Sequence, residues 1–236
     1  MGFLKESIAM SARAKRCHKQ WAAHYTQCQQ AILKAAINCP EHRTILIFGA
    51  GSLNDVPLAI LANQFKKVIL VDLIFLKSAK QKAAKFDNVE LVEHDITESL
   101  DDIKQGKPNV QIPSRWLDCD DIDLVVSLNL ITQLPLIPVR WLIKKHKFSE
   151  EQGDVVGKQL IFSHLQYLRA FLGKVCLIAD RLDIEINGSG EETDRFDPWW
   201  EVEAPQEEFS WDWEVMPLGE VSMKKRQINK VGVSIL

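Results

Sequence analysis

The sequence predicts an α/β fold with a mostly parallel sheet, a C-terminal antiparallel hairpin and an N-terminal helical extension. Three observations predict it. Short apolar runs alternate with helical patterns between residues 43 and 183, a long helical pattern precedes them, and two strand-like segments close the chain. Strands that alternate with helices indicate right-handed crossovers and therefore parallel strands. A length of 236 residues suits one such domain with an added cap.

Residues 5–38 are predicted to form a helix, and residues 1–42 as a whole an N-terminal extension or cap. Asn38 and Pro40 mark the end of this helix. Apolar residues recur at three- and four-residue steps and so share one face. The residues of this face are Ala14, Cys17, Trp21, Tyr25, Cys28 and Ile32.

A group of cations lies around the start of this apolar face. We favour a solvated basic surface, which is the usual role of such runs on helices. The alternative is a cap helix that presents cations to an acidic substrate. The group consists of Arg13, Lys15, Arg16, His18 and Lys19.

Residues 43–236 are predicted to form the α/β domain. Its expected strands are "TILIFGAG", "KKVILVDLIF", "VELVEHDI", "IDLVVSLNL" and "KVCLIADRLD". Its expected helices are "VPLAILANQF", "LKSAKQKAAKF", "PVRWLIKKH" and "KQLIFSHLQYLRAFL", and "DDIKQGKPNVQIPSRWLDCDD" is a polar connector. The segments "FSWDWEVMP" and "RQINKVGVSIL", separated by the turn "PLGE", are predicted to pair as a hairpin at the sheet edge.

An acidic excursion over residues 186–209 interrupts this pattern and contains Trp199 and Trp200. We favour packing against the edge of the sheet for the two tryptophans. A substrate lid or a partner contact is the alternative.

Composition narrows the class of protein. The net charge of −3 disfavours a nucleic-acid partner, and no apolar run reaches transmembrane length. The N-terminus lacks a signal-peptide core, so we expect a cytoplasmic protein without a membrane partner, with a homo-oligomer possible. The five cysteines form no CxxC pair and the histidines no HxxxH pattern, so reduced thiols and no metal site are expected.

The turn "GAGSLND" raises the question of a ligand. Gly49 and Gly51 allow the backbone to approach a polar ligand closely, although a tight turn without a ligand explains a lone GxG equally well. Asp72 ends the second predicted strand, about twenty residues on, where an acid can accept hydrogen bonds from ribose hydroxyls. Asp95 ends the third strand, where an acid can accept from an adenine amine while Ile96 packs on the ring. Ligands bind at this edge of α/β sheets.

On these segments the chain resembles the class I S-adenosylmethionine-dependent methyltransferases, in particular a bacterial branch of that superfamily. The resemblance covers roughly residues 43–236 and implies a Rossmann-like seven-stranded sheet with S-adenosylmethionine as cofactor. It implies that the glycine-rich turn contacts the methionine portion, the acid after strand two the ribose, and the acid after strand three the adenine amine. The cofactor site then comprises Gly49, Ala50, Gly51, Asp72, Leu73, Asp95, Ile96 and Ser127.

Three positions depart from the pattern of the family. Ile47 stands where an acid is common, Leu53 replaces the third turn glycine, and "SLNLITQLP" lacks the Asn/Asp-Pro-Pro-aromatic motif. The missing motif argues against methylation of nucleobases or glutamine amides. We expect a methyltransferase that acts on a small molecule or a protein side chain. The alternatives are a catalytically inactive binding or scaffold protein and, less favoured, an NAD-binding oxidoreductase, whose GxGxxG turn would need glycine where Asn54 stands.

Substrate contacts are expected at the end of the fourth strand and from the cap. Asn129 and Gln133 are the candidates there for hydrogen bonds to the methyl acceptor, and capping of the next helix is an equally good explanation. Trp21, Tyr25 and His18 could close the site from the N-terminal helix, although the spacing of Trp21 and Tyr25 favours a place in the core.

Overall fold

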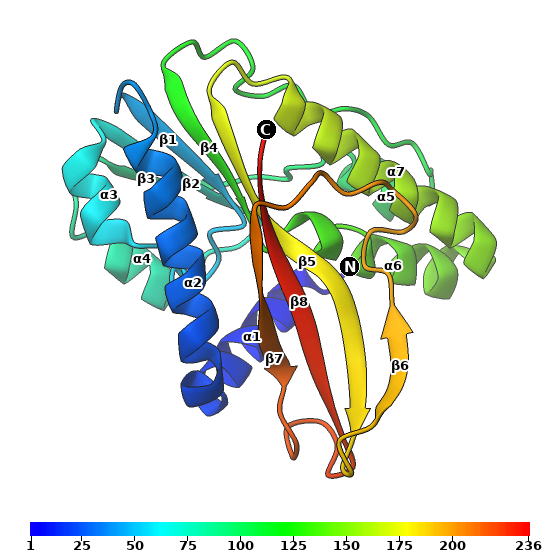
Figure 1. Ribbon diagram of the computed structural model, residues 1–236. Helices are drawn as coiled ribbons and strands as arrows, with labels where there is room; N and C mark the ends of the chain where they lie inside the picture. The colour runs from blue at the N-terminus through cyan, green and yellow to red at the C-terminus, as the bar shows by residue number, and fades with distance from the viewer.

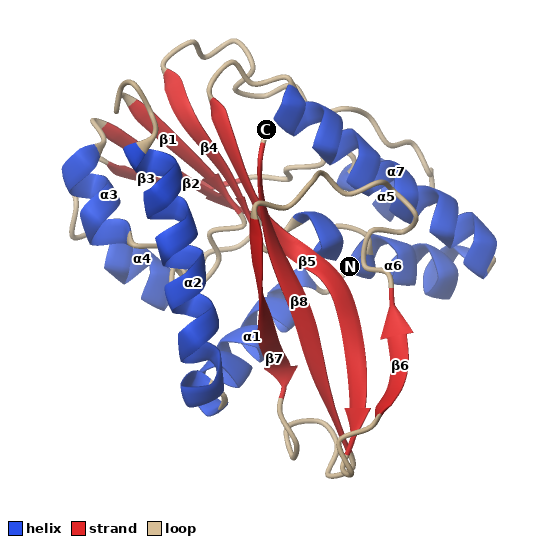
Figure 2. Ribbon diagram, in the orientation of Figure 1, coloured by secondary structure: helices blue, strands red, loops and turns tan.

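The computed structural model describes all 236 residues and has one mixed sheet with helices on both faces (Figures 1 and 2). The strands are β1 (Thr44–Phe48), β2 (Lys67–Asp72), β3 (Val89–Glu93), β4 (Ile122–Leu128), β5 (Lys174–Asn187), β6 (Glu192–Phe196), β7 (Phe209–Met216) and β8 (Lys225–Ile235). The helices are α1 (Phe3–Arg16), α2 (His18–Ile37), α3 (Leu58–Gln64), α4 (Lys77–Ala83), α5 (Leu100–Lys104), the 3-10 turn η1 (Ile131–Gln133), α6 (Leu136–His146) and α7 (Glu150–Arg169).

The strand order is β3-β2-β1-β4-β5-β8-β7, and β6 pairs with the outer part of β5. Strands β1 to β5 pair in parallel along this path, whereas β8 is antiparallel to both β5 and β7. The prediction of a Rossmann-like, mostly parallel sheet with a closing antiparallel pair is confirmed. The expected seven strands become eight because part of the acidic excursion forms β6 along the exposed edge of β5.

The core has two layers because successive residues of a strand point to opposite faces of the sheet. Every residue of β1 is buried. Ile45 and Ile47 pack in the layer that contains α2, whereas Leu46 and Phe48 pack in the layer that contains α7. Figure 1 shows α2, α3 and α4 on one side of the sheet and α5, α6 and α7 on the other.

The N-terminal segment forms two helices instead of the single helix expected over residues 5–38. The break is at Cys17, whose backbone (φ −93°, ψ 17°) leaves the helical region. Helix α2 packs on the sheet and buries Trp21, Cys28 and Ile32, as the apolar face predicts. Helix α1 has no buried residue and takes a different direction (Figure 1). The break therefore separates an anchored helix from a surface helix.

The connector over residues 101–121 contains one element that the sequence did not predict. Its first residues form the last part of the short helix α5. The carboxylate of Asp95 accepts the backbone N–H groups of Ser99 and Leu100 at 3.0 and 2.9 Å, which satisfies free donors at the start of this helix. Sequence patterns for helix starts look for a capping side chain directly before the helix, so they do not reveal a cap supplied by Asp95.

Of the two tryptophans of the excursion, Trp199 packs against the sheet at β5, as the favoured interpretation predicts, whereas Trp200 lies against helix α7. The side chain of Trp199 is 2% exposed, and its Nε1–H donates to the backbone oxygen of Asp180 at 2.7 Å. Trp200 lies against Gly157 of α7, where a Cβ atom would collide with the indole ring. The two tryptophans therefore attach the excursion to β5 and to α7.

None of the helices combines the length and the apolar character that a membrane-spanning helix needs.

Candidate functional site

A cavity of about 300 Å³ opens at the carboxyl ends of β1, β2 and β4. Its walls come from the loops after β1, β2, β3 and β4, and helix α1 supplies a further side with Phe3, Glu6, Ser7, Met10, Ser11 and Ala14. Strand ends of an open α/β sheet are where ligands bind in such folds. The volume lies at the lower end of the range of small-molecule pockets.

The glycine-rich turn forms one wall of the cavity. Gly49 has φ +78°, and a Cβ atom there would lie 2.5 Å from the backbone oxygen of Leu128, so only glycine fits between β1 and β4. Gly51 also has a positive φ of +45°. Leu53, which replaces the third glycine, adopts a left-handed φ of 57°, and its side chain is buried in the core and outside the cavity lining. The leucine therefore leaves the cavity open.

Asp72 lines the cavity at the end of β2, as expected. Its Oδ2 accepts the backbone N–H of Gly51 at 2.9 Å, and its Oδ1 accepts the N–H of Ile74 at 3.4 Å. Burial raises the pKa of this carboxyl group, and the backbone hydrogen bonds oppose that rise. A carboxylate can accept about four hydrogen bonds, so these backbone donors leave acceptor capacity for a ligand.

Asp95 and Ile96 also line the cavity, but the Asp95 carboxylate is already engaged. Besides the two N–H groups at the start of α5, its Oδ1 accepts both the backbone N–H and the hydroxyl of Thr97, at 2.9 and 2.7 Å. Four bonds fill the acceptor capacity of a carboxylate. The direct bond to an adenine amine expected for Asp95 therefore has no free acceptor site, and the residue fixes the shape of this loop.

Ser127 is the one predicted cofactor residue that lies outside the cavity lining. It is fully buried, and its hydroxyl lies 3.1 Å from Nε2 of His164 on α7. The prediction placed it at the ligand edge because it ends the apolar run of β4. The pleat directs its side chain into the core layer of α7 instead.

Asn129 and Gln133 both line the cavity but differ in their bonding. The Asn129 amide lies 3.1 Å from Oδ2 of Asp55 and 3.2 Å from Nε2 of His24. Asn129 has a left-handed φ of 48°, and its Oδ1 is buried without a partner. Gln133 is exposed, and its side chain makes no hydrogen bond within the protein. The nitrogen of the Asn129 amide is therefore engaged within the protein, whereas both atoms of the Gln133 amide are free to bind a ligand.

The part of the cavity beneath α1 is apolar and aromatic. Trp21 and Tyr25 line it, as the sequence allowed, together with Trp213 from β7. His18 is exposed and lies outside it. No lysine or arginine is among the lining residues, so the basic residues of α1 do not present cations to this cavity. Arg13 and Arg16 instead form ion pairs with Glu220 in the turn between β7 and β8.

Two residues that the sequence analysis did not select, His24 and Asp55, form the polar part of this wall. His24 stacks on Trp213 with the ring centroids 3.9 Å apart, and burial lowers its pKa to about 3. Burial raises the pKa of Asp55 to about 6. His24 and Cys28 are four residues apart on α2, a spacing visible in the sequence. Their convergence with Asp55 depends on the packing of α2 against the glycine-rich turn.

No family model matches the sequence, and no curated protein matches it. Among solved structures the chain is similar to the N-methyltransferase NodS from Bradyrhizobium japonicum WM9 in complex with S-adenosyl-L-homocysteine, with 11% identity, 90% of this chain and 87% of that chain covered, and a TM-score of 0.44. It is also similar to phosphoethanolamine N-methyltransferase 1 of Haemonchus contortus, solved with phosphoethanolamine and S-adenosylhomocysteine. The identity is 13%, the match covers 74% of this chain and 32% of that chain, and the TM-score is 0.41. A third similar structure is a complex of DhpI with SAM and HEP. The identity is 12%, the match covers 96% of this chain and 97% of that chain, and the TM-score is 0.41.

Proposed function

We propose that the protein is an S-adenosylmethionine-dependent methyltransferase. The observation that carries the proposal is the single cavity in which Gly49, Gly51 and Asp72 meet an apolar chamber closed by α1. The glycine-rich turn, Asp72 and Asp95 also carry the resemblance to the class I methyltransferases, and that resemblance implies S-adenosylmethionine as the cofactor. NodS, the phosphoethanolamine enzyme and DhpI were solved with this cofactor or its demethylated product, at similarities that concern the fold alone.

In this proposal the adenosyl group lies along the carboxyl ends of β1, β2 and β3. The free acceptor sites on Asp72 bind the ribose hydroxyls, and the glycine-rich turn lies against the methionine portion. Leu73 and Ile96, which both line the cavity, flank the adenine ring. Asp95 contributes by holding its loop in place, since its carboxylate is saturated by loop donors.

The cofactor supplies an activated methyl group, so the chain's own residues mainly bind and orient the acceptor and exclude water. The chamber beneath α1 offers apolar contacts from Phe3, Met10 and Trp213. The free amide of Gln133 can bind a polar group of the acceptor. The absence of lysine and arginine from the lining favours a neutral or cationic acceptor over an anionic one. A small molecule or a protein side chain fits this description.

Calorimetric titration with S-adenosylmethionine, S-adenosylhomocysteine and NAD tests the proposal. The two adenosyl sulfur ligands are expected to bind with one site per chain, and NAD is not. Mass spectrometry of the denatured protein provides an independent check for a retained adenosyl ligand. Binding of NAD alone would identify the oxidoreductase alternative. Binding of the cofactor without methyl transfer to any amine, thiol or hydroxyl acceptor would favour the inactive binding protein.

A further inference from the structure

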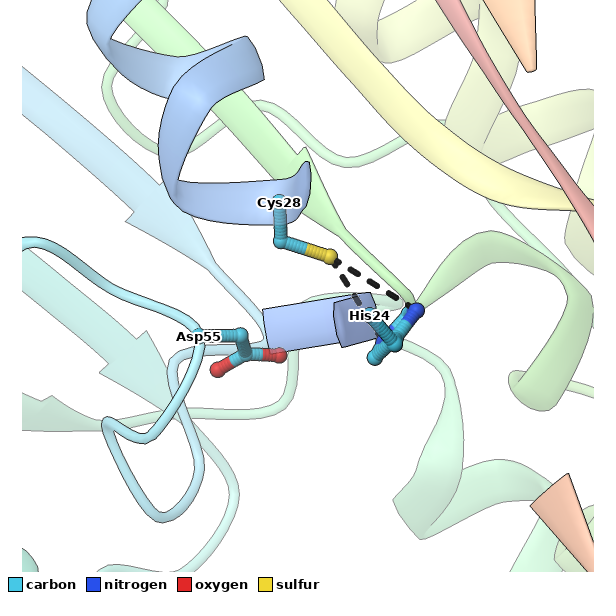
Figure 3. Close-up of side chains that lie close together, drawn as sticks. All are labelled: His24, Cys28 and Asp55. Atoms are coloured by element: carbon cyan, nitrogen blue, oxygen red, sulfur yellow. Dashed lines mark hydrogen bonds between the residues drawn. The ribbon is translucent and has the colours of Figure 1, made fainter. Parts of the chain in front are cut away.

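Asp55 is the carboxyl group of the cavity wall that has no cation and no assigned ligand. Asp95 is saturated by its own loop, Asp72 is assigned to the ribose, and Glu6 is in an ion pair. Asp55 lines the cavity from the glycine-rich turn, and its side-chain partner is the amide of Asn129, 3.1 Å from Oδ2. Figure 3 shows that its carboxyl group is directed toward α2. The groups on α2 therefore decide which protonation state Asp55 adopts.

The surroundings of His24 determine which of its ring nitrogens carries the proton. Burial lowers the pKa of His24 to about 3, so the imidazole is neutral and has a single proton. The Nε1–H of Trp211 donates to Nδ1 at 3.2 Å. An indole N–H only donates, so Nδ1 is the acceptor and the proton lies on Nε2. Stacking on Trp213, with the ring centroids 3.9 Å apart, holds the imidazole in this position.

The proton on Nε2 in turn determines the orientation of the Asn129 amide. The amide nitrogen lies 3.2 Å from His24 Nε2 and 3.1 Å from Asp55 Oδ2, so as placed it is a donor that faces the Nε2–H donor. Rotation of the amide by 180° brings its oxygen to this position, where it accepts the Nε2–H. The oxygen then lies beside Oδ2, and two oxygens at this separation need a hydrogen between them. The network therefore favours a protonated Asp55 whose O–H donates to Asn129.

The charged groups around Asp55 act in both directions. Burial raises the pKa of Asp55 to about 6, and the Asp72 carboxylate adds to the rise. Its own backbone N–H, the Asn129 amide as placed and Lys82 of α4 oppose it. The titratable groups that face it from α2 are held neutral by burial, and they are His24, Tyr25 and Cys28. The other titratable groups of the cavity lining are Glu6, His94 and Asp95.

The Asn129 amide can stabilise Asp55 in either protonation state. Its oxygen accepts from the neutral carboxyl group, and its nitrogen donates to the carboxylate in the orientation that the structure has. In the second arrangement the Nε2–H of His24 has only the sulfur of Cys28, a weak acceptor 3.5 Å away. The neutral form is therefore favoured until a positive charge enters the cavity, because such a charge stabilises the carboxylate.

We propose that Asp55 accepts the proton that the methyl acceptor loses, and that Asn129, His24 and Trp211 are its positioning residues. The inference rests on the proposed function. Asp55 lies in the turn assigned to the methionine portion, so it releases its proton to solvent when the positively charged sulfonium is bound. In the reaction the acceptor's nitrogen, oxygen or sulfur bonds to the methyl carbon, and the methyl–sulfur bond breaks with its electron pair on sulfur. The positive charge is then lost, and the acceptor's proton passes to Asp55.

Calorimetric titration of the full-length protein in buffers of different ionisation enthalpy measures the protons released on binding. S-adenosylmethionine and S-adenosylhomocysteine differ in the sulfonium charge, so the difference between them isolates its effect. At pH 6 S-adenosylmethionine is expected to release about half a proton more per molecule, because a group with a pKa of about 6 is half protonated there. Asp55→Asn should abolish this difference. The matched control is Asp87→Asn, an exposed position that should retain it.

Trp211→Phe tests the network at a residue outside the cavity lining. Without the indole N–H, His24 can carry its proton on Nδ1 and accept from the Asn129 nitrogen, which then also donates to an ionised Asp55. The extra proton release at pH 6 should therefore fall by about half. Unchanged release in Trp211→Phe or in Asp55→Asn would overturn the proposal, and Trp211→Phe decides if Asp55→Asn does not fold by circular dichroism.

The same titrations separate this inference from the proposed function. If the wild type binds both ligands with equal proton release, the role of Asp55 is wrong and the cofactor site stands. If the wild type binds neither ligand, the proposed function and the role of Asp55 are both wrong.

Discussion

Asp183 is a half-buried carboxyl group on β5 whose surroundings disfavour its charge. Its Oδ1 is buried without a partner, and its Oδ2 accepts only a long bond of 3.4 Å from Gln227. Burial raises its pKa to about 7, and the nearby Asp180 carboxylate adds to the rise. The pKa of this carboxyl group is higher in the folded protein than in the unfolded chain. The group therefore destabilises the folded protein as the pH rises from the unfolded-state pKa through the folded-state pKa.

Asp183→Asn is therefore expected to increase the free energy of unfolding at pH 8 by about 1–2 kcal/mol. The gain should shrink toward pH 4, where the folded carboxyl group is already neutral. Urea denaturation at both pH values measures it. Asp212→Asn, an exposed position on β7, is the control and is expected to have little effect at either pH. An equal effect of Asp183→Asn at both pH values would contradict this interpretation.

Gly49 is a second residue whose identity is dictated by its surroundings. Gly49→Ala is expected to destabilise the protein by about 2 kcal/mol or more, since the new Cβ would lie 2.5 Å from the Leu128 oxygen at a φ of +78°. The measurement is the midpoint of thermal unfolding. Gly188→Ala is the matched control, because its Cβ would meet only an ordinary contact at 3.7 Å. Similar losses in both variants would refute the close approach at Gly49.

At the scale of elements, α1 is a helix attached mainly by its ends. It buries no residue, and yet six of its side chains line the cavity. Near its start Glu6 pairs with Arg140 of α6 at 2.9 Å, and near its end Arg13 and Arg16 pair with Glu220. A helix held in this way can open without disturbing the core, because few apolar contacts oppose the movement. It is suited to admit a ligand and then exclude water.

Glu220→Gln is expected to loosen this attachment. Amide hydrogen exchange over residues 3–16 should become about tenfold faster, as the loss of a charged hydrogen bond predicts. Glu201→Gln removes an exposed acid that pairs with Lys158 and should leave the exchange of α1 unchanged. If α1 exchanges at the same rate in all three proteins, Glu220 does not hold it.

The same attachment has a defined pH dependence. The hydrogen bond from Arg16 lowers the pKa of Glu220 to about 2, with a further contribution from Arg13. A lowered pKa means that the stabilisation is complete above the unfolded value of Glu and is lost as the pH falls through about 2. In the wild type α1 should therefore remain attached at pH 5. If the amide hydrogens of α1 in the wild type exchanged at pH 5 as fast as those of the Glu220→Gln variant, this expectation would be wrong.

For the whole molecule, the periodicity of the sequence was enough to predict the sheet. Buried runs such as "TILIF" and the alternation in "FSWDWEV" carry the information locally, and the structure has strands there. The break at Cys17 and the strand β6 depend on contacts with distant segments, which local patterns do not contain. The strand-end position of Asp72 was also correctly predicted, whereas β3 ends at Glu93 and Asp95 lies in the loop that follows. The saturation of Asp95 was not predicted, because its donors belong to the segment that follows it.

The polar wall of the cavity shows the limit of sequence reasoning most clearly. The pattern His24-x3-Cys28 places two polar side chains on one helix face but does not indicate what lies opposite them. Asp55 and Asn129 meet them only because α2 packs against β4 and the glycine-rich turn. In the same way, the direction of Ser127 follows from the pleat of β4 and cannot be read from its place at the end of an apolar run.

Titration of the wild type and of Asp72→Asn with S-adenosylhomocysteine tests the central claim most directly. Asp87→Asn, an exposed position before β3, is the control. We expect the wild type and the control to bind one molecule per chain with equal affinity. Asp72→Asn should bind at least tenfold more weakly, because the amide loses acceptor sites for the ribose hydroxyls. Absence of binding to the wild type, or equal binding to Asp72→Asn, would contradict the assignment of this cavity as an S-adenosylmethionine site.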